Sequence, residues 1–506
     1  MLRKIVKLVV SNSWLVGNKT ILCVLAGVFT ALPFANGRLW VFSWFGFVPL
    51  FAALRNNTKF KSFLFSYFTG VIFWACTIYW LIHVTLPGTI ILVLYLALYF
   101  GVFGLLVFTT SHELRATSLL FIPSLWVLLE YLRSYLLTGF PWAILGYGQY
   151  LNLPVIQIAD ITGAWGVSFL VMMANVAIYI MVTKFRGRSW RATGAAILAV
   201  LVVLIYGYYK LGRQISSIGH RTVKISVIQG NIPQERKWDA YSRDFIIDRY
   251  IELTRQAAKD NPDLIIWPEA ALPVIPQLYP SYYERAQASA KEINTPLLLG
   301  AVTLRENHYH NSAILISKDG MTLNFYDKLH LVPFGEYTPL KEFFSFLEAI
   351  VPIGEMTPGR ERTVFTSPAR FSVLICFEDL FPELSRNFVN GGAEFLVNIT
   401  NDAWYKKTDA PYQHLQASVL RAVENRLFLV RAANTGISSF IAPTGEITSS
   451  VRDGRGTEIF VSGYRTQRIL AGKGPLSFYG RHGDIFIFIL PVFLIYGIFR
   501  SKKHAL

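Results

Sequence analysis

The amino-acid sequence predicts a multi-span α-helical membrane bundle joined to an extramembrane α/β domain. Two features lead to this prediction: long apolar runs fill residues 1–210, and short apolar stretches alternate with amphipathic ones in residues 220–466. Of the 506 residues, 53% are hydrophobic and only 16% are charged, whereas an ordinary soluble domain has about 25% charged residues. This composition argues against a soluble protein and favours a membrane protein.

The chain is strongly basic, with a formal net charge of +16. Nucleic-acid binding is one interpretation of such a charge, but the Lys and Arg residues do not form a single patch. Many of them stand in short clusters between apolar runs, which is typical of cytoplasmic loops that face anionic lipid headgroups. We therefore expect a membrane partner and no nucleic acid.

Eight apolar segments are candidates for membrane-spanning helices, each of which needs about 20 residues. Seven lie in the first 210 residues and one lies near the end. The first two are short and are separated only by Asn36-Gly37-Arg38, so their limits are soft. The predicted spans are 21–35, 39–54, 63–85, 89–110, 117–136, 162–183, 193–209 and 484–499.

The distribution of basic residues predicts the orientation of the bundle. Lys and Arg occur at both termini and in every second loop, whereas the alternate loops 86–88 and 137–161 contain neither. Positively charged loops remain in the cytoplasm. Both termini are therefore expected in the cytoplasm, with residues 210–483 on the outer side. The first apolar run lacks a small-residue cleavage site, so we interpret it as a retained anchor rather than a removed signal peptide.

Residues 220–466 are predicted to form a layered α/β domain, between a seven-helix bundle (1–210) and a final span (484–499). Strand-like and helix-like segments alternate along this region, which is typical of α/β packing. The predicted strands are 223–229, 263–267, 296–302, 371–376 and 395–399, and the predicted helices are 241–259, 280–293 and 411–427.

Two polar residues of this domain are candidates for chemistry. Glu269 follows the apolar run 264–268, and α/β folds usually place their sites at the ends of such strands. Lys328 lies in an irregular loop, 326–339, where an ammonium group could stabilise an oxyanion or lower the pKa of a nearby thiol. Taken singly, Glu269 could equally be a solvated acid on a loop, and Lys328 is more simply explained as a surface lysine.

The three cysteines differ in their surroundings. Cys23 and Cys76 lie in apolar runs and are most simply packing residues, and no disulfide framework or Cys-x-x-Cys metal motif is present. Cys376 ends a predicted strand and precedes a helix-compatible stretch. A helix N-terminus favours the reactive thiolate, so a lowered pKa is expected. The alternative is a buried structural cysteine. Three acidic residues nearby in the sequence argue against this interpretation, because they make the turn polar: Glu378, Asp379 and Glu383.

A Glu, a Lys and a Cys in this order, spread over about 110 residues, resemble the nitrilase superfamily. The similarity is strongest to the membrane-bound branch that N-acylates bacterial lipoproteins, and it covers nearly the whole chain. It implies an α-β-β-α sandwich for the extramembrane domain. The segments that carry it are 229–238 (QGNIPQERKW), 267–273 (WPEAALP), 326–339 (YDKLHLVPFGEYTP), 375–383 (ICFEDLFPE), 398–405 (NITNDAWY) and 421–438 (RAVENRLFLVRAANTGIS).

The resemblance also implies roles for individual residues. Glu269 matches the general base of this family, Lys328 matches its oxyanion-stabilising lysine and Cys376 matches its nucleophile. The family often has Tyr directly after the nucleophile, and this sequence has Phe, which lacks the hydroxyl. Four further residues match supporting positions of the active site: Glu336, a second essential glutamate, and Trp238, Phe377 and Glu378.

The reaction implied by the resemblance is the last step of lipoprotein maturation in the bacterial cytoplasmic (inner) membrane. The sn-1 acyl chain of a phospholipid would pass through a cysteine thioester to the free α-amine of a diacylglyceryl-cysteine lipoprotein. Such a reaction needs no metal and no organic cofactor. The expected partners are the phospholipid donor and the lipoprotein acceptor, and the enzyme is expected to be a monomer.

Other hypotheses remain open at this point. The apolar segment 342–356 is either a lid that dips into the bilayer or a core helix, and the aromatic loop 139–150 could contact lipid. Glu130 and Arg133 form either a functional intramembrane pair or a structural one.

For the function of the whole chain, the second hypothesis is a membrane-anchored amidase that uses the same Glu, Lys and Cys. A scaffold or transporter would leave those three residues unexplained.

Overall fold

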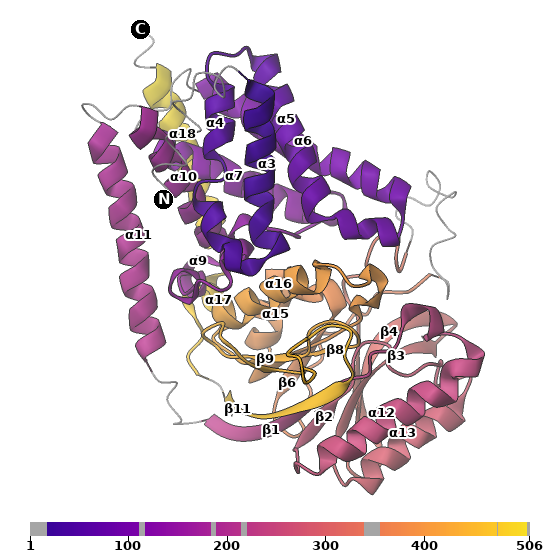
Figure 1. Cartoon of the computed structure of the whole chain (residues 1–506). Coiled ribbons are helices and arrows are strands. Elements are labelled where there is room, and N and C mark those ends of the chain that lie inside the picture. Colours follow the sequence, from indigo (N-terminus) through magenta and orange to yellow (C-terminus); the bar gives the residue numbers. More distant parts are fainter. Residues whose placement is uncertain are drawn as a thin grey trace. The chain divides into compact units, whose positions relative to one another are not determined.

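The computed structural model describes residues 18–110, 117–183, 189–213, 220–337, 355–472 and 474–502. The chain forms two compact units (Figure 1). A helical unit comprises Met1–Gln214 together with His482–Leu506, and an α/β unit comprises Ile215–Arg481. Apart from Glu355 and Met356, the segment 342–356 lies outside the described residues.

The helical unit consists of apolar helices joined by short turns. Five of its described segments are long and apolar enough to cross a membrane: Gly37–Leu54, Leu86–Val107, Ser118–Thr138, Ala164–Thr183 and Thr193–Gly212. Its helices are α3 (Lys19–Ala35), η1 (Gly37–Trp44), α4 (Val48–Leu54), α5 (Lys59–Thr77), η2 (Tyr79–His83), α6 (Leu86–Thr110), α7 (Ser118–Tyr135), η3 (Leu136–Thr138), η4 (Leu145–Gln149), α8 (Leu153–Ile156), α9 (Ala159–Thr162), α10 (Ala164–Thr183), α11 (Ser189–Gly212) and α18 (Ile485–Lys502).

The predicted span 39–54 falls within the candidate span Gly37–Leu54, but it consists of two helices rather than one. The 3-10 helix η1 ends at Trp44, and α4 begins only at Val48. Asn175, a buried side chain of α10, bridges this break: its amide nitrogen donates to Ser43 O at 2.7 Å, and its oxygen accepts from Phe47 N–H at 2.9 Å. A distant side chain thus satisfies the backbone groups that a continuous helix would pair internally.

The segment 63–85 is also not one helix. Helix α5 ends at Thr77, and the 3-10 helix η2 follows as a separate element. The indole N–H of Trp80 donates to the Thr77 carbonyl at 3.0 Å. This bond satisfies one of the carbonyls that a helix end leaves without an intrahelical partner.

Glu130 and Arg133 hold the aromatic loop 139–150 inside the helical unit. Glu130 Oε1 accepts from Leu145 N–H at 2.7 Å, and Arg133 Nη1 donates to Trp142 O at 2.8 Å. Residues 141–150 are all buried. The loop therefore leaves little surface for the lipid contact that the sequence allowed, because two buried charged side chains bond its backbone groups and keep it within the unit.

The α/β unit contains two sheets. The six-stranded sheet has the order β11-β1-β2-β3-β4-β5, and the five-stranded sheet has the order β10-β9-β8-β7-β6. The strands are β1 (His220–Gln229), β2 (Leu264–Ile266), β3 (Leu297–Arg305), β4 (His308–Ile316), β5 (Thr322–Asp327), β6 (Phe371–Ile375), β7 (Phe395–Thr400), β8 (Leu429–Ala433), β9 (Ser439–Ile441), β10 (Ile447–Ser450) and β11 (Gly463–Gly472).

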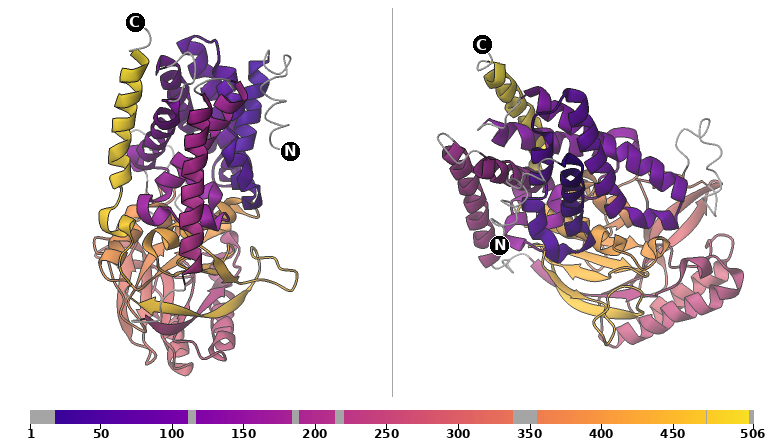
Figure 2. Two further views of the ribbon diagram at one scale, coloured as in Figure 1. Left: turned by 90° about the vertical axis from the view of Figure 1, so that its left-hand side faces the viewer. Right: turned by 45° about the horizontal axis from the view of Figure 1, so that its top comes forward.

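Helices cover the outer face of each sheet, so that the unit is an α-β-β-α sandwich. Helices α12 (Arg243–Ala258) and α13 (Pro280–Glu292) lie side by side on the six-stranded sheet (Figure 1; Figure 2, right). Helices α15 (Pro382–Asn390) and α16 (Ala410–Asn425) pack on the five-stranded sheet, while β1 contacts β8 and β4 contacts β6 between the sheets. The predicted fold class is confirmed.

The parallel strands position the candidate site. Strands β1, β2 and β3 run parallel in one sheet, and β6, β7 and β8 run parallel in the other. Both faces of these strands are covered, which explains why β2, β6, β7 and β8 are buried at every position. Glu269 follows β2 and Cys376 follows β6, so each lies at the carboxyl end of a central strand.

Candidate active site

Glu269 lies in a sharp turn after β2. Its neighbour Ala270 has a positive φ of 44°, and Glu269 itself is 7% exposed. Gly300 of β3 allows the chain to pass closely here, because a Cβ at this position would come within 2.4 Å of Pro268 O. The ammonium group of Lys237 donates to the Glu269 carbonyl at 3.0 Å. The backbone that carries this carboxylate is therefore fixed on two sides.

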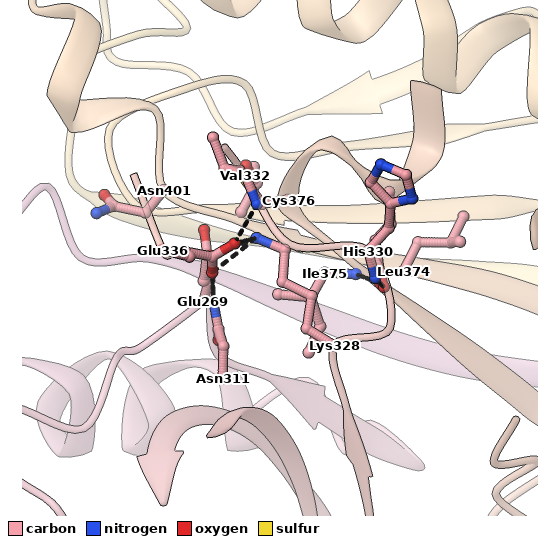
Figure 3. Close-up of polar contacts among 12 residues, drawn as sticks. Glu269, Asn311, Lys328, His330, Val332, Glu336, Leu374, Ile375, Cys376 and Asn401 are labelled. Atoms are coloured by element: carbon pink, nitrogen blue, oxygen red, sulfur yellow. Dashed lines mark hydrogen bonds and ion pairs between the residues drawn. The ribbon is translucent and has the colours of Figure 1, made fainter. Parts of the chain in front are cut away.

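Lys328 lies between two carboxylates, as Figure 3 shows. Its Nζ is 2.8 Å from Glu336 Oε2 and 3.7 Å from Glu269 Oε1, and the side chain is 1% exposed. Burial disfavours the charged ammonium, but Glu336 and Glu269 outweigh this effect and raise the pKa of Lys328 above its usual value. Lys328 is therefore a permanent cation in a site shielded from water.

Asn311 of β4 joins the same two carboxylates from another side. Its Nδ2 donates to Glu269 Oε1 and to Glu336 Oε1, both at 2.8 Å (Figure 3). Glu336 Oε2 also accepts from Val332 N–H at 2.7 Å. Glu336 is thus held by an ammonium, an amide and a backbone N–H, while Glu269 is tied to Asn311 and Lys328.

Cys376 is buried at the start of the 3-10 helix η8 (Cys376–Leu380), with a φ of +55°. For a residue other than glycine this conformation costs about 1–3 kcal/mol and persists only where the surroundings impose it. Burial and the Glu269 charge raise the pKa of the Cys376 thiol, against the opposing effects of Lys328 and a hydrogen bond from Thr400. The expected lowering of this pKa was wrong: only a short 3-10 turn follows the cysteine, and burial outweighs its dipole. The resting group is a thiol, which needs a base.

The four supporting residues predicted from the resemblance have different surroundings. The Phe377 ring lies 5.7 Å from Lys328 Nζ and packs edge-on against Phe381. Glu336 joins Lys328, as described above. Trp238 is half-buried, and no hydrogen bond or ion pair among the described residues connects it to the other candidates. Glu378 is fully buried behind the cysteine turn.

Glu378 pins the lysine loop to the cysteine turn. One oxygen accepts from the N–H groups of Leu329 (2.7 Å) and His330 (3.1 Å), and the other accepts from Ile375 N–H at 2.7 Å. The Tyr326 hydroxyl donates to this carboxylate as well, at 2.9 Å. The backbone segments on either side of the site thus share one carboxylate.

Replacing Glu378 by glutamine is expected to weaken the connection between the lysine loop and the cysteine turn. It is also expected to change how the free energy of unfolding depends on pH. Burial raises the pKa of Glu378 to about 7. At a pH between the ordinary pKa of 4.5 and the raised pKa of about 7, Glu378 keeps its proton in the folded chain and releases it in the unfolded chain. The free energy of unfolding of the native chain therefore falls as the pH rises through this window, by up to about 3 kcal/mol.

Glu378→Gln removes that dependence, and its amide would face the Ile375 N–H, a loss of about 1–3 kcal/mol. Thermal unfolding of both chains from pH 4.5 to 8 measures the difference. The exposed Glu284→Gln on α13 is the control. Parallel pH curves for the native and Glu378→Gln chains would contradict the expectation.

Three residues near the site were not predicted from the sequence. They are Asn311, Lys237 and Tyr405. Burial lowers the pKa of Lys237 to about 8, although Glu269 and Cys376 oppose this shift. Burial, with the charges of Cys376 and Asp402, raises the pKa of the Tyr405 phenol. Lys237 and Tyr405 lie in segments that carried the resemblance, 229–238 and 398–405, whereas Asn311 lies outside all of them. Among the described residues, no group of three or more His, Cys, Asp or Glu side chains could hold a metal ion.

Comparison with known proteins agrees with this architecture. Residues 224–461 match the family model of carbon-nitrogen hydrolases, and residues 26–177 match that of the apolipoprotein N-acyltransferase N-terminal domain. The α/β unit is thus a nitrilase-type catalytic domain, in a membrane protein with an additional helical unit. The chain is 40% identical to the apolipoprotein N-acyltransferase of Geobacter metallireducens over 92% of each chain. It belongs to the apolipoprotein N-acyltransferase family and is an acyltransferase.

Other similar proteins include the apolipoprotein N-acyltransferase of Shewanella oneidensis, which is 31% identical over 86% of this chain and 87% of its own length. Among solved structures, an amidase from Nesterenkonia sp. AN1 in complex with acrylamide is 17% identical. The structural match covers 55% of this chain and 98% of the amidase chain, with a TM-score of 0.40.

Proposed function

We propose that this chain N-acylates bacterial lipoproteins with an acyl chain taken from a phospholipid. The acceptor would be the α-amine of an N-terminal diacylglyceryl-cysteine. The observation that carries the proposal is the buried arrangement of Glu269, Lys328 and Cys376 in a membrane protein. A base, a cation and a thiol within electrostatic range of one another suit acyl transfer through a thioester.

In the first half of the reaction, Glu269 takes the proton of the Cys376 thiol. The raised pKa of this thiol makes such a base necessary. The sulfur attacks the ester carbonyl of the phospholipid, and a C–S bond forms. Lys328 and the backbone N–H of Phe377 stabilise the oxyanion. The ester C–O bond then breaks, and Glu269 returns its proton to the departing lysophospholipid alkoxide.

In the second half, the lipoprotein amine attacks the thioester. Glu269 accepts a proton from the amine nitrogen, a C–N bond forms and the C–S bond breaks. The proton passes to the Cys376 sulfur, which restores the thiol. The lysophospholipid leaves before the lipoprotein enters, so ping-pong kinetics are expected. Glu336 keeps Lys328 charged and in place throughout both halves.

We place the enzyme in the bacterial cytoplasmic (inner) membrane, with both termini in the cytoplasm and the α/β unit on the outer face. The alternation of basic and uncharged loops along the sequence supports this orientation. A membrane anchor also suits the proposed donor, because the ester bond of a phospholipid lies at the bilayer interface. We propose that the enzyme works as a monomer.

Intact-mass spectrometry tests the proposed thioester. The full-length protein is incubated with a phosphatidylethanolamine of one defined acyl chain, without any acceptor. The expected result is a mass increase of one acyl group, which hydroxylamine removes. Cys23→Ser and Cys76→Ser should gain the same adduct, because neither cysteine belongs to the site. If the protein hydrolyses a small amide but never gains the adduct, it is a membrane-anchored amidase instead.

A further inference from the structure

A cluster of four charged side chains lies in the protein interior next to the Cys376 turn. It consists of Asp379 of η8, Asp402 of η9 (Asp402–Tyr405), His414 of α16 and Arg431 of β8. All four are at most 1% exposed. None of them belongs to the proposed base, cation and nucleophile, and the reaction described above does not use them.

The four charges pair in a closed ring. His414 Nε2 is 2.9 Å from Asp379 Oδ1, and its Nδ1 is 3.0 Å from Asp402 Oδ1. Arg431 lies 3.2 Å from the second oxygen of each aspartate. Each aspartate therefore meets both cations. Ser418 also donates to Asp379.

The protonation state of the ring follows from its geometry. Both nitrogens of His414 face carboxylate oxygens, and only an imidazolium can donate from both. Burial and the neighbouring Arg431 charge oppose the imidazolium, but Asp379 and Asp402 outweigh them and raise the pKa of His414. The two aspartates and the two cations then cancel, so the buried ring carries no net charge. Losing one member leaves a buried charge unpaired, which is far more costly than the intact ring.

An asparagine connects this ring to the nucleophile. Arg431 Nη1 donates to Asn398 Oδ1 at 2.7 Å. Asn398 Nδ2 in turn donates to Cys376 O at 2.9 Å and to Leu374 O at 3.1 Å. The ring is thus connected to Leu374 and Cys376 through Asn398. It is also connected to the end of the turn directly, because Asp379 belongs to η8. These are the attachments that a non-glycine residue at a φ of +55° requires.

We propose that Asp379, Asp402, His414 and Arg431 form a charge-balanced positioning network that holds Cys376 in its reactive conformation through Asn398. The inference rests on the proposed function, in which Cys376 is the nucleophile. A purely structural role is the competing explanation. The two differ in kinetics, because misplacing a nucleophile lowers kcat without changing how the phospholipid binds.

Charge compensation is the test. His414→Gln leaves two aspartates with one cation, and we expect kcat to fall about 10²-fold, as for a catalytic group displaced by about 1 Å. The KM for phospholipid should stay within about twofold. Asp379→Asn/His414→Gln restores the balance of charge, and kcat should recover at least about tenfold over the single variant. Both are measured in the full-length chain, together with the rate of Cys376 alkylation by iodoacetamide.

Two further variants keep the test decisive if His414→Gln does not fold. Asn398→Ser leaves the four charges balanced but removes the connection to Cys376, so kcat should fall even at temperatures where thermal unfolding shows that the variant is fully folded. Ser226→Ala is the control: it removes the partly buried Ser226–Thr466 hydrogen bond on the other sheet and should leave kcat unchanged.

The proposal fails if the variants lower the melting temperature but keep the native kcat, or if the double variant is no faster than His414→Gln. Failure of the proposed function would look different, because the native chain itself would then form no acyl adduct.

Discussion

Replacing Cys376 by serine should lower the rate of lipopeptide N-acylation at least about 10³-fold. A hydroxyl group holds its proton far more tightly than a thiol, and the proposed base, the Glu269 carboxylate, would remove it far less readily. An oxyester would also transfer its acyl group to an amine more slowly than a thioester. The measurement is kcat with a synthetic diacylglyceryl-cysteine peptide and phosphatidylethanolamine.

The other two cysteines provide matched controls for this variant. Cys76→Ser removes an exposed thiol, and Cys23→Ser removes a buried one. Both should keep the native rate within about twofold, because surface and packing substitutions of this size leave the site unchanged. Activity of Cys376→Ser within tenfold of the native chain would exclude Cys376 as the nucleophile.

Replacing Lys328 by methionine should lower kcat by about 10³-fold, at the upper end of the cost of losing one oxyanion-stabilising group. The loss exceeds that of a simple hydrogen-bond donor, because Glu269 and Glu336 then share a buried site without a counter-charge. Breaking a buried ion pair also lowers stability by about 3–5 kcal/mol. Steady-state kinetics and thermal unfolding measure the two effects.

A second substitution separates these effects. The double variant Lys328→Met/Glu336→Gln lacks one positive and one negative charge of the site. Most of the stability that Lys328→Met loses should therefore return. The activity should not return, because the oxyanion still lacks its cation. If the double variant regains activity along with stability, Lys328 serves only to neutralise Glu336 and takes no part in catalysis.

The sequence alone predicted much of the fold and the candidate catalytic residues. Apolar runs of fixed length and strand-helix alternation are local patterns, and they located strands such as 223–229 and 395–399 within a few residues of β1 and β7. Motifs that resemble a known family pointed to Glu269, Lys328 and Cys376. Their catalytic roles remain predictions, but the structure brings Glu269 and Glu336 into one cluster around the buried Lys328.

Only the tertiary structure decided the environment of these residues. Asn311, Lys237 and His414 contact their partners across strands or between elements far apart in the chain, and no local pattern records such contacts. The same holds for Asn175, which bridges a broken helix from 128 and 132 residues away. The raised pKa of the Cys376 thiol has this origin too, because burial depends on the whole fold, whereas the sequence shows only the short turn that follows the cysteine.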